Sequence, residues 1–178
     1  MTFNAPRGLT DEIKLRLLYR EAFPKEERKP FSIIKRMQKT GKTDIWIFEE
    51  DGKFLGMATT INGTDKILVD YFAVTKKERG KGNGGIMLEA IIKHYLPRAV
   101  FLEIEIPYED ADNYAERKRR KSFYLSHGLC EIGTRAKLFG VDMELLGTGI
   151  SMSFDEYRNF YLENYGRFAY DNIEAIEP

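Results

Sequence analysis

Apolar residues follow a helical spacing in some segments of the chain and form short continuous runs in others. Near the N-terminus, Ile13, Leu17 and Leu18 recur at helical spacing and predict a helix that Thr10 caps. Residues 67–74 form an apolar run rich in β-branched and aromatic side chains, which is typical of a buried strand. The predicted elements in chain order are helices over 11–23 and 31–39, strands over 44–50, 53–62 and 67–74, a helix over 84–95, a strand over 100–106, a helix over 112–126, two strands within 131–146 and a helix over 154–165. This order predicts one mixed α/β unit.

The composition is that of a single domain. The chain has 178 residues, of which 43% are hydrophobic and 13% aromatic, enough for one core and too few for a second independent domain. Its 28 basic and 28 acidic residues cancel, so net charge provides no general attraction to nucleic acid or to an anionic membrane. We therefore expect one domain over residues 1–178, with no nucleic-acid partner and no membrane partner.

Cysteine usage and the N-terminal sequence favour the cytoplasm. The one cysteine, Cys130, rules out an internal disulfide framework and suits a reducing compartment. The N-terminus has no apolar stretch of the signal-peptide kind, and no apolar run reaches transmembrane length. No spacing of histidine, cysteine and carboxylate residues predicts a metal site.

A basic, glycine-rich segment after the strand over 67–74 has the composition of a diphosphate-binding loop. Its residues are Arg79, Gly80, Lys81, Gly82, Asn83, Gly84 and Gly85. Glycines permit positive φ angles and let backbone N–H groups approach a ligand closely. The helix that begins near Gly84 adds unpaired N–H donors and the positive end of its dipole. A bound diphosphate satisfies both sets of donors.

Three phosphate-binding patterns compete for this loop. The nucleoside-triphosphate pattern is absent, because no Gly-Lys pair is followed by Ser or Thr. The dinucleotide pattern G-x-G-x-x-G matches at Gly80, Gly82 and Gly85, with Glu103 and Glu105 about 20 residues further on. However, a basic spacer separates the strand from the first glycine, and the chain after residue 106 lacks further alternating strands and helices. The third pattern is a coenzyme A loop, and a dinucleotide-dependent oxidoreductase stays open as an alternative.

The spacing of the arginine and two of the glycines is the most informative motif in the chain. Arg79, Gly82 and Gly84 fit the pattern Q/R-x-x-G-x-G/A at a strand-to-helix junction, and Val74 lies five residues before the arginine. In both respects the segment resembles the signature of the GNAT superfamily of N-acetyltransferases.

A second motif lies on the late predicted helix. Phe123-Tyr124 is followed by Gly128, which is similar to the family's aromatic pair and glycine on such a helix. The next residue is Leu129, where the family usually has phenylalanine. The two motifs occur in the family's order with a strand between them. The resemblance covers residues 43–139, and residues 148–178 form a C-terminal helix and tail.

The resemblance implies a fold and a cofactor. The fold is a mixed, mostly antiparallel sheet flanked by helices, in which two neighbouring parallel strands splay apart and hold coenzyme A. Acetyl-CoA is then the co-substrate, with its pantetheine arm on the backbone of Phe72 and Val74 and its diphosphate on the amides of residues 79–85. The implied cofactor-binding residues are Phe72, Ala73, Val74, Arg79, Gly80, Lys81, Gly82, Asn83, Gly84 and Gly85. The resemblance also allows a homodimer.

The resemblance implies that the acetyl group passes directly to a primary amine in a ternary complex. Tyr124 matches the family's tyrosine, four residues before Gly128. Its phenol is the expected acid, which protonates the departing thiolate. The acceptor is open among amino acids, polyamines, aminoglycosides, peptides and the N-terminal amines of proteins. A non-catalytic acyl-CoA-binding module is the alternative from a different class.

Two carboxylates compete for the role of the base. Glu103 shares one strand face with Phe101 and Glu105 by period-two alternation, and it resembles the base glutamate of some family members. Asp70 is the only charged residue in the strand over 67–74. Carboxylates in strands this apolar are costly unless they are paired or functional. The alternative for each is an ion pair with a nearby Arg or Lys, and the base can also be a water or absent.

The chain departs from the family pattern between the two catalytic candidates. The segment between Glu103 and Tyr124 is longer than usual, and Asn113 lies 11 residues before Tyr124, too far for the family's asparagine contact to the cofactor. The basic run 116–121 indicates a solvated helix face. Contact of this run with phosphate or with an acidic substrate is the alternative.

Overall fold

The structure, a computed structural model, describes residues 1–176 apart from the side chain of Glu26, and it divides into two units. The first unit comprises Met1–Asn62 and Val69–His94, and the second comprises Gly63–Leu68 and the chain from Tyr95 onward. Strand β4 (Lys66–Val74) is divided between them. Its first residues belong to the second unit and its later residues to the first.

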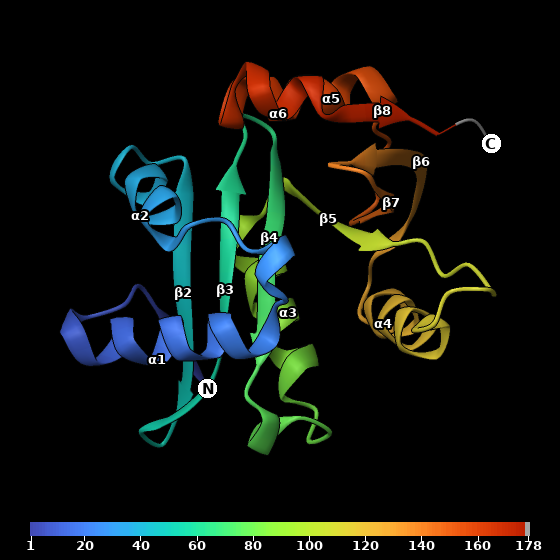
Figure 1. Cartoon of the computed structure of the whole chain (residues 1–178). Helices are drawn as coiled ribbons and strands as arrows, with labels where there is room; N and C mark the ends of the chain where they lie inside the picture. Colours follow the sequence, from blue (N-terminus) through green and yellow to red (C-terminus); the bar gives the residue numbers. More distant parts are fainter. Residues whose placement is uncertain (177–178) are drawn as a thin grey trace. The chain divides into compact units, whose positions relative to one another are not determined.

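The first unit has helices on both faces of its sheet (Figure 1). Its elements are β1 (Thr2–Asn4), α1 (Gly8–Ala22), the 3-10 helix η1 (Lys25–Glu27), α2 (Phe31–Lys39), β2 (Thr43–Glu50), β3 (Lys53–Asn62), the later part of β4, the 3-10 helix η2 (Lys76–Glu78) and α3 (Asn83–Tyr95). Leu15 of α1 and Ile34 of α2 are buried in one cluster with Ile45 of β2. The next residue of β2, Trp46, points to the opposite face, where its ring lies 4.9 Å from that of His94 in α3.

Helix α1 buries a different face from the one that the apolar spacing predicts. Leu18 is buried, but Ile13 and Leu17 are 50% and 61% exposed. The helix instead directs Tyr19 towards the sheet, where its ring meets Tyr71 edge-on with the centroids 4.8 Å apart. Aromatic rings bury the largest apolar areas in protein cores. The orientation that buries Tyr19 is therefore favoured over the one that buries Ile13 and Leu17.

The second unit is a mixed sheet with two longer helices. Its elements are the first part of β4, β5 (Ala99–Glu105), α4 (Tyr114–Ser126), β6 (Cys130–Leu138), β7 (Val141–Gly147), α5 (Phe154–Tyr165), α6 (Arg167–Asp171) and β8 (Ile173–Ala175). β4 and β5 are parallel, with Leu68 opposite Phe101, whereas β7 and β8 pair antiparallel with their neighbours. A capping box of Ser153 and Glu156 starts α5, and the Phe160 ring of α5 packs on Phe101 at 5.1 Å.

Because β4 contributes to both units, the hydrogen-bonded strand order is β1-β2-β3-β4-β5-β7-β6-β8. This confirms the predicted mixed, mostly antiparallel sheet with one pair of parallel neighbours and flanking helices. Each predicted helix and strand is present within a few residues of its predicted bounds. The prediction missed β1, α6 and β8, which are too short to show a period in the sequence. Within residues 1–176, no helix is both long and apolar enough to cross a membrane.

Candidate active site

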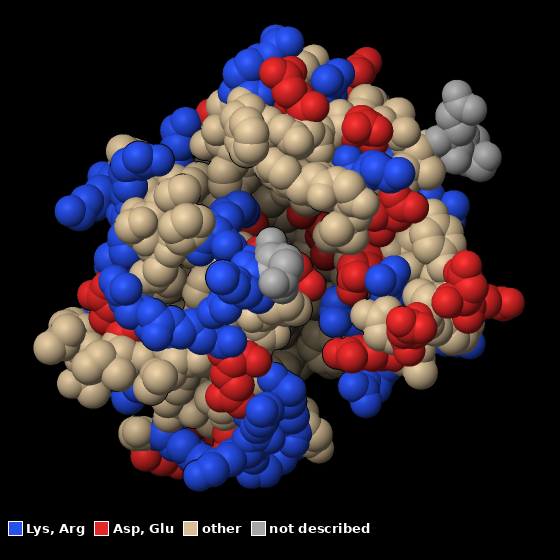
Figure 2. Space-filling view, viewed as in Figure 1, with Lys and Arg blue, Asp and Glu red and all other residues tan. Residues whose placement is uncertain are grey.

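The predicted cofactor loop lies in the first unit, where β4 ends and α3 begins. Gly80 and Gly82 have φ angles of 74° and 81°, a region that glycine adopts at no steric cost. Arg79 donates through Nε to the Val74 carbonyl oxygen at 3.0 Å. Helix α3 begins at Asn83, one residue before the predicted start, and the first N–H groups of a helix have no acceptor within it. Lys and Arg side chains gather over this turn (Figure 2), so donors and positive charge coincide there.

Glu78 holds this loop together from the inside. It is 4% exposed and forms ion pairs with Lys53 at 2.5 Å and Lys81 at 3.2 Å. The side-chain amide of Asn83 donates to the Glu78 carbonyl oxygen at 3.3 Å and to its Oε2 at 3.4 Å. The hydrogen bond from Lys53 is the main reason that the pKa of Glu78 lies below its usual range. The sequence did not predict a role for Glu78, whose only signal is that it is one acid within a basic segment.

Asp70 is paired with a cation from the segment between α1 and α2. Lys29 Nζ lies 2.6 Å from Asp70 Oδ1, and the Lys29 N–H donates to the Tyr71 hydroxyl oxygen at 3.0 Å. The Tyr71 hydroxyl donates to the Glu27 carbonyl oxygen at 2.8 Å, and the Tyr19 hydroxyl donates to that of Lys29 at 3.0 Å. Burial raises the pKa of Tyr71 well above its usual range, so its hydroxyl remains a donor. This network fixes the segment against β4.

Tyr124 is buried near the end of α4 in the second unit. Its exposed fraction is 9%, and its ring lies 5.2 Å from that of Phe123. Burial raises the pKa of Tyr124 to about 12, and the nearby Arg120 opposes this only in part. The phenol is therefore protonated at neutral pH and carries a proton that it can donate.

Glu103 is held by two tyrosines of α5. The Tyr157 hydroxyl donates to Glu103 Oε1 at 2.8 Å. The Tyr161 hydroxyl lies 2.7 Å from Oε1 and 3.0 Å from Oε2. The sequence predicted either a catalytic base or an ion pair at Glu103, and neither tyrosine was predicted as its partner. Their signal was the helical spacing of aromatic residues in 154–165, which also fits a core-facing helix.

Part of the basic run on α4 binds the carboxylates of the sheet. Arg117 and Arg120 lie 2.7 Å and 3.4 Å from the carboxylate of Glu105, and Lys121 lies 2.7 Å from that of Glu144. The prediction of a solvated helix face is therefore wrong for Arg117 and Lys121, whose side chains are mostly buried. Long basic side chains reach a sheet edge from a helix that otherwise faces water.

The candidate residues fall into two groups. The first unit holds the loop of residues 79–85, which follows β4 and η2, and it holds Asp70 of β4, which pairs with Lys29. The second unit holds Tyr124 on α4 and Glu103 on β5. Among residues 1–176, no three His, Cys, Asp or Glu side chains are placed to bind a metal ion.

The Glu78 ion pairs predict that the loop is sensitive to acid. Because the folded-state pKa of Glu78 lies below its usual value of 4.5, the pairs stabilise the folded chain above about pH 4.5 and are lost as the pH falls through the lower folded-state value. We expect Glu78→Gln to lower the free energy of unfolding at neutral pH, by an amount that vanishes in acid. Urea denaturation across pH measures this, with Glu109→Gln on an exposed loop as the control. A pH-independent difference contradicts the assignment.

The bonds to Glu103 predict a stabilising role for both tyrosine hydroxyls. Tyr157→Phe and Tyr161→Phe each remove a donor from a carboxylate, so we expect the free energy of unfolding to fall by about 1–2 kcal/mol in each variant. Tyr170→Phe in α6 is the matched control, because Tyr170 contacts Arg158 through its ring. Equal stability of all three variants in urea denaturation would show that the hydroxyls do not hold Glu103.

Solved structures of known proteins share this fold. A protein from Bacteroides thetaiotaomicron assigned to the GNAT family of acetyltransferases matches with a TM-score of 0.77 and 22% identity over 94% of this chain and 99% of that one. The ribosomal-protein-S18-alanine N-acetyltransferase of Escherichia coli matches with a TM-score of 0.61 and 21% identity over 85% and 94%. An acetyltransferase of Bacillus subtilis in complex with CoA matches with a TM-score of 0.60 and 13% identity over 83% and 97%.

Sequence comparison identifies the family directly. No curated protein matches the chain significantly. The model of the acetyltransferase (GNAT) family, however, matches residues 13–119. This range is more than half of the chain and includes the loop at residues 79–85, although it ends before Tyr124. The chain therefore belongs to the GNAT family of acetyltransferases.

Proposed function

We propose that the chain transfers the acetyl group of acetyl-CoA to a primary amine by direct attack in a ternary complex, with residues 1–178 acting as one acetyltransferase domain. The observation that carries the proposal is the turn between η2 and α3, where Gly80 and Gly82 adopt positive φ directly before a helix begins. Backbone amides and a helix N-terminus in this arrangement suit a diphosphate. The CoA complex of the Bacillus subtilis acetyltransferase supports the same cofactor, in preference to a dinucleotide.

The loop has room for such a ligand. A Cβ atom added at Gly80 or Gly82 would meet no atom of the described chain within 4 Å beyond the glycine and its two neighbours in the sequence. The amides of residues 79–85 would hold the diphosphate, and the backbone of Phe72 and Val74 would hold the pantetheine arm. Lys81 is fixed on the loop by Glu78 and adds a positive charge. Bound acetyl-CoA supplies the activated acetyl group, and the chain supplies its position.

Tyr124 is the general acid of this proposal. Burial raises its pKa to about 12, so its phenol carries a proton that the coenzyme A thiolate can accept as it departs. Its match to the family motif supports the role. A backbone N–H within 72–74 would stabilise the oxyanion that forms on the acetyl carbonyl.

Glu103 is the base of this proposal, with Asp70 as the alternative. The hydroxyls of Tyr157 and Tyr161 fix the orientation of the Glu103 carboxylate. Its resemblance to the base glutamate of some family members supports the role. Asp70 accepts from Lys29 at 2.6 Å and would need that cation to move aside.

The acceptor is a small-molecule or peptide amine. The Escherichia coli structural neighbour is named for an alanine of a ribosomal protein, which supports an amine acceptor in general. A free, exposed Cys130 suits the reducing cytoplasm as the site of the reaction.

A non-catalytic acyl-CoA-binding module is the competing function. Acetyl-CoA binding in calorimetry, combined with no release of the coenzyme A thiol in the presence of any amine of a broad library, would favour the module.

Loss of the Tyr124 hydroxyl tests the acid. We expect Tyr124→Phe to lower kcat about 100-fold or more with little change in the KM for acetyl-CoA. Because the pKa of Tyr124 is about 12, the wild-type rate should show no loss from its ionisation until the pH approaches that value. The rate of coenzyme A thiol release, measured across acetyl-CoA concentration and pH, gives kcat, KM and the pH dependence. Tyr114→Phe at the start of the same helix is the control. Unaltered turnover in Tyr124→Phe would contradict the assignment.

The pH dependence of kcat/KM distinguishes the two candidate bases. A base must be ionised to act, so its loss removes the acidic limb of the profile. We expect Glu103→Gln to lose this limb and Asp70→Asn to keep it. The opposite result assigns the base to Asp70, and an intact limb in both variants shows that neither residue is the base.

A further inference from the structure

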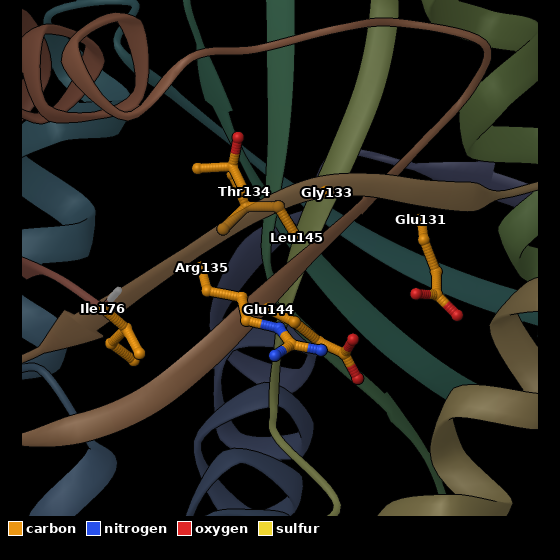
Figure 3. Close-up of a pocket in the computed structure, with 7 residues that line it drawn as sticks. All are labelled: Glu131, Gly133, Thr134, Arg135, Glu144, Leu145 and Ile176. Carbon is orange, nitrogen blue, oxygen red and sulfur yellow. The ribbon is translucent and has the colours of Figure 1, made fainter. Parts of the chain in front are cut away.

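The second unit contains a cavity of about 350 Å³ beside strands β6 and β7 (Figure 3). Glu131 and Arg135 of β6 and Glu144 of β7 contribute charged side chains to its lining. Cavities of about 300–1,000 Å³ are typical of small-molecule sites. Its size therefore suits a small ligand, and its lining suits a polar one.

A bulge in β6 forms one wall of the cavity. Glu131 lies opposite Leu146 and Arg135 lies opposite Glu144, so the three residues of β6 between Glu131 and Arg135 face only one residue of β7. Gly133, within this bulge, has a φ angle of 88° that favours glycine. Bulges re-aim side chains and are over-represented beside functional sites.

Glu144 presents an unsatisfied acceptor. The residue is 4% exposed, and its Oε2 accepts from Lys121 at 2.7 Å. Its Oε1 is buried and has no hydrogen-bond partner among residues 1–176. A buried carboxylate oxygen without a donor is costly. A ligand that brings an N–H donor into the cavity would remove this cost.

The guanidinium of Arg135 is the positively charged counterpart of the Glu144 carboxylate in this cavity. It lies directly opposite Glu144 in the strand register, which puts the two side chains on the same side of the strand pair (Figure 3). Within the described chain, nevertheless, no ion pair joins Arg135 to Glu144 or to another carboxylate. An exposed guanidinium presents a planar set of donors that matches a carboxylate.

The charges around the cavity balance. Lys121 lies 2.9 Å from Glu131 and 2.7 Å from Glu144. Burial lowers the pKa of Lys121, but the hydrogen bonds to these two carboxylates outweigh burial and raise the pKa above its usual value. Among the described residues, the cations Lys121 and Arg135 therefore offset the anions Glu131 and Glu144. A ligand with one positive and one negative group preserves this balance, whereas a simple anion or cation disturbs it.

We propose that this cavity binds a free α-amino acid. The ammonium group donates to Glu144 Oε1, and the carboxylate group accepts from the Arg135 guanidinium. The Oε1 atom of Glu144, which has no hydrogen-bond partner among residues 1–176, thereby gains a donor, and the Arg135 guanidinium gains a carboxylate. The site needs neither coenzyme A nor acetyl transfer, so its occupancy is independent of the proposed enzymatic function.

Calorimetric titration of the full chain without coenzyme A tests the proposal, with the 20 common L-amino acids as probes. We expect saturable binding of at least one of them. The N-acetyl derivative of the best ligand lacks the ammonium, and its amide lacks the carboxylate. Both should bind about tenfold more weakly or worse, since each loses a charged hydrogen bond. Failure of every amino acid to bind, or equal binding of either derivative, overturns the proposal.

Two variants assign the binding to this cavity. Glu144→Gln and Arg135→Gln should each weaken binding by about tenfold or more. Lys137→Gln is the control, because Lys137 lies on the same strand but faces Asp142 at 3.7 Å. Glu144 is buried and its substitution can affect folding, whereas Arg135 is exposed. Circular dichroism checks both variants, and wild-type affinity in folded Arg135→Gln overturns the proposal.

Discussion

Strand β4 is the element on which both units depend, because it supplies residues to each and is followed, after η2, by the cofactor loop. Tyr71 and Ala73 are buried, and they alternate with the more exposed Asp70, Phe72 and Val74. A slip of one residue in this strand would exchange the two sets of side chains. It would place the Asp70 carboxylate in the core and remove it from Lys29. The apolar face of β4 thus fixes which backbone groups are available to a cofactor.

In the second unit, carboxylates on two adjacent strands fix the helices. Glu103 and Glu105 lie on β5 and Glu144 lies on β7, and their partners come from α5 for the first and from α4 for the other two. The ion pairs of Glu105 and Glu144 contribute little net stability when the loss of hydration is included. Removal of one partner is nevertheless costly, because the remaining charge stays buried. The pairs therefore determine where each helix lies more than how firmly the unit folds.

Local features of the sequence predict most of the elements and the loop, whereas the partners of the charged residues were not predictable. The turn at Gly80 and Gly82 follows from the φ preference of glycine, which is a property of single residues. The partners of Glu103 lie 54 and 58 residues further along the chain, and only packing decides such contacts. Helix α1 carries two apolar faces, and the spacing of Ile13 and Leu17 does not reveal that the face with Tyr19 is buried.

The hydroxyls of Tyr157 and Tyr161 come from outside residues 13–119, the range that the family model covers. A carboxylate within the family region is thus satisfied by a helix beyond it. In a relative that has the glutamate but not the tyrosines, the carboxylate lacks these hydrogen-bond donors. In a relative that has the tyrosines but an apolar residue in place of the glutamate, the hydroxyls lack a hydrogen-bond acceptor. Evolution is then expected to change the two positions together, and covariation across 54 positions would mark the relatives that share this C-terminal helix.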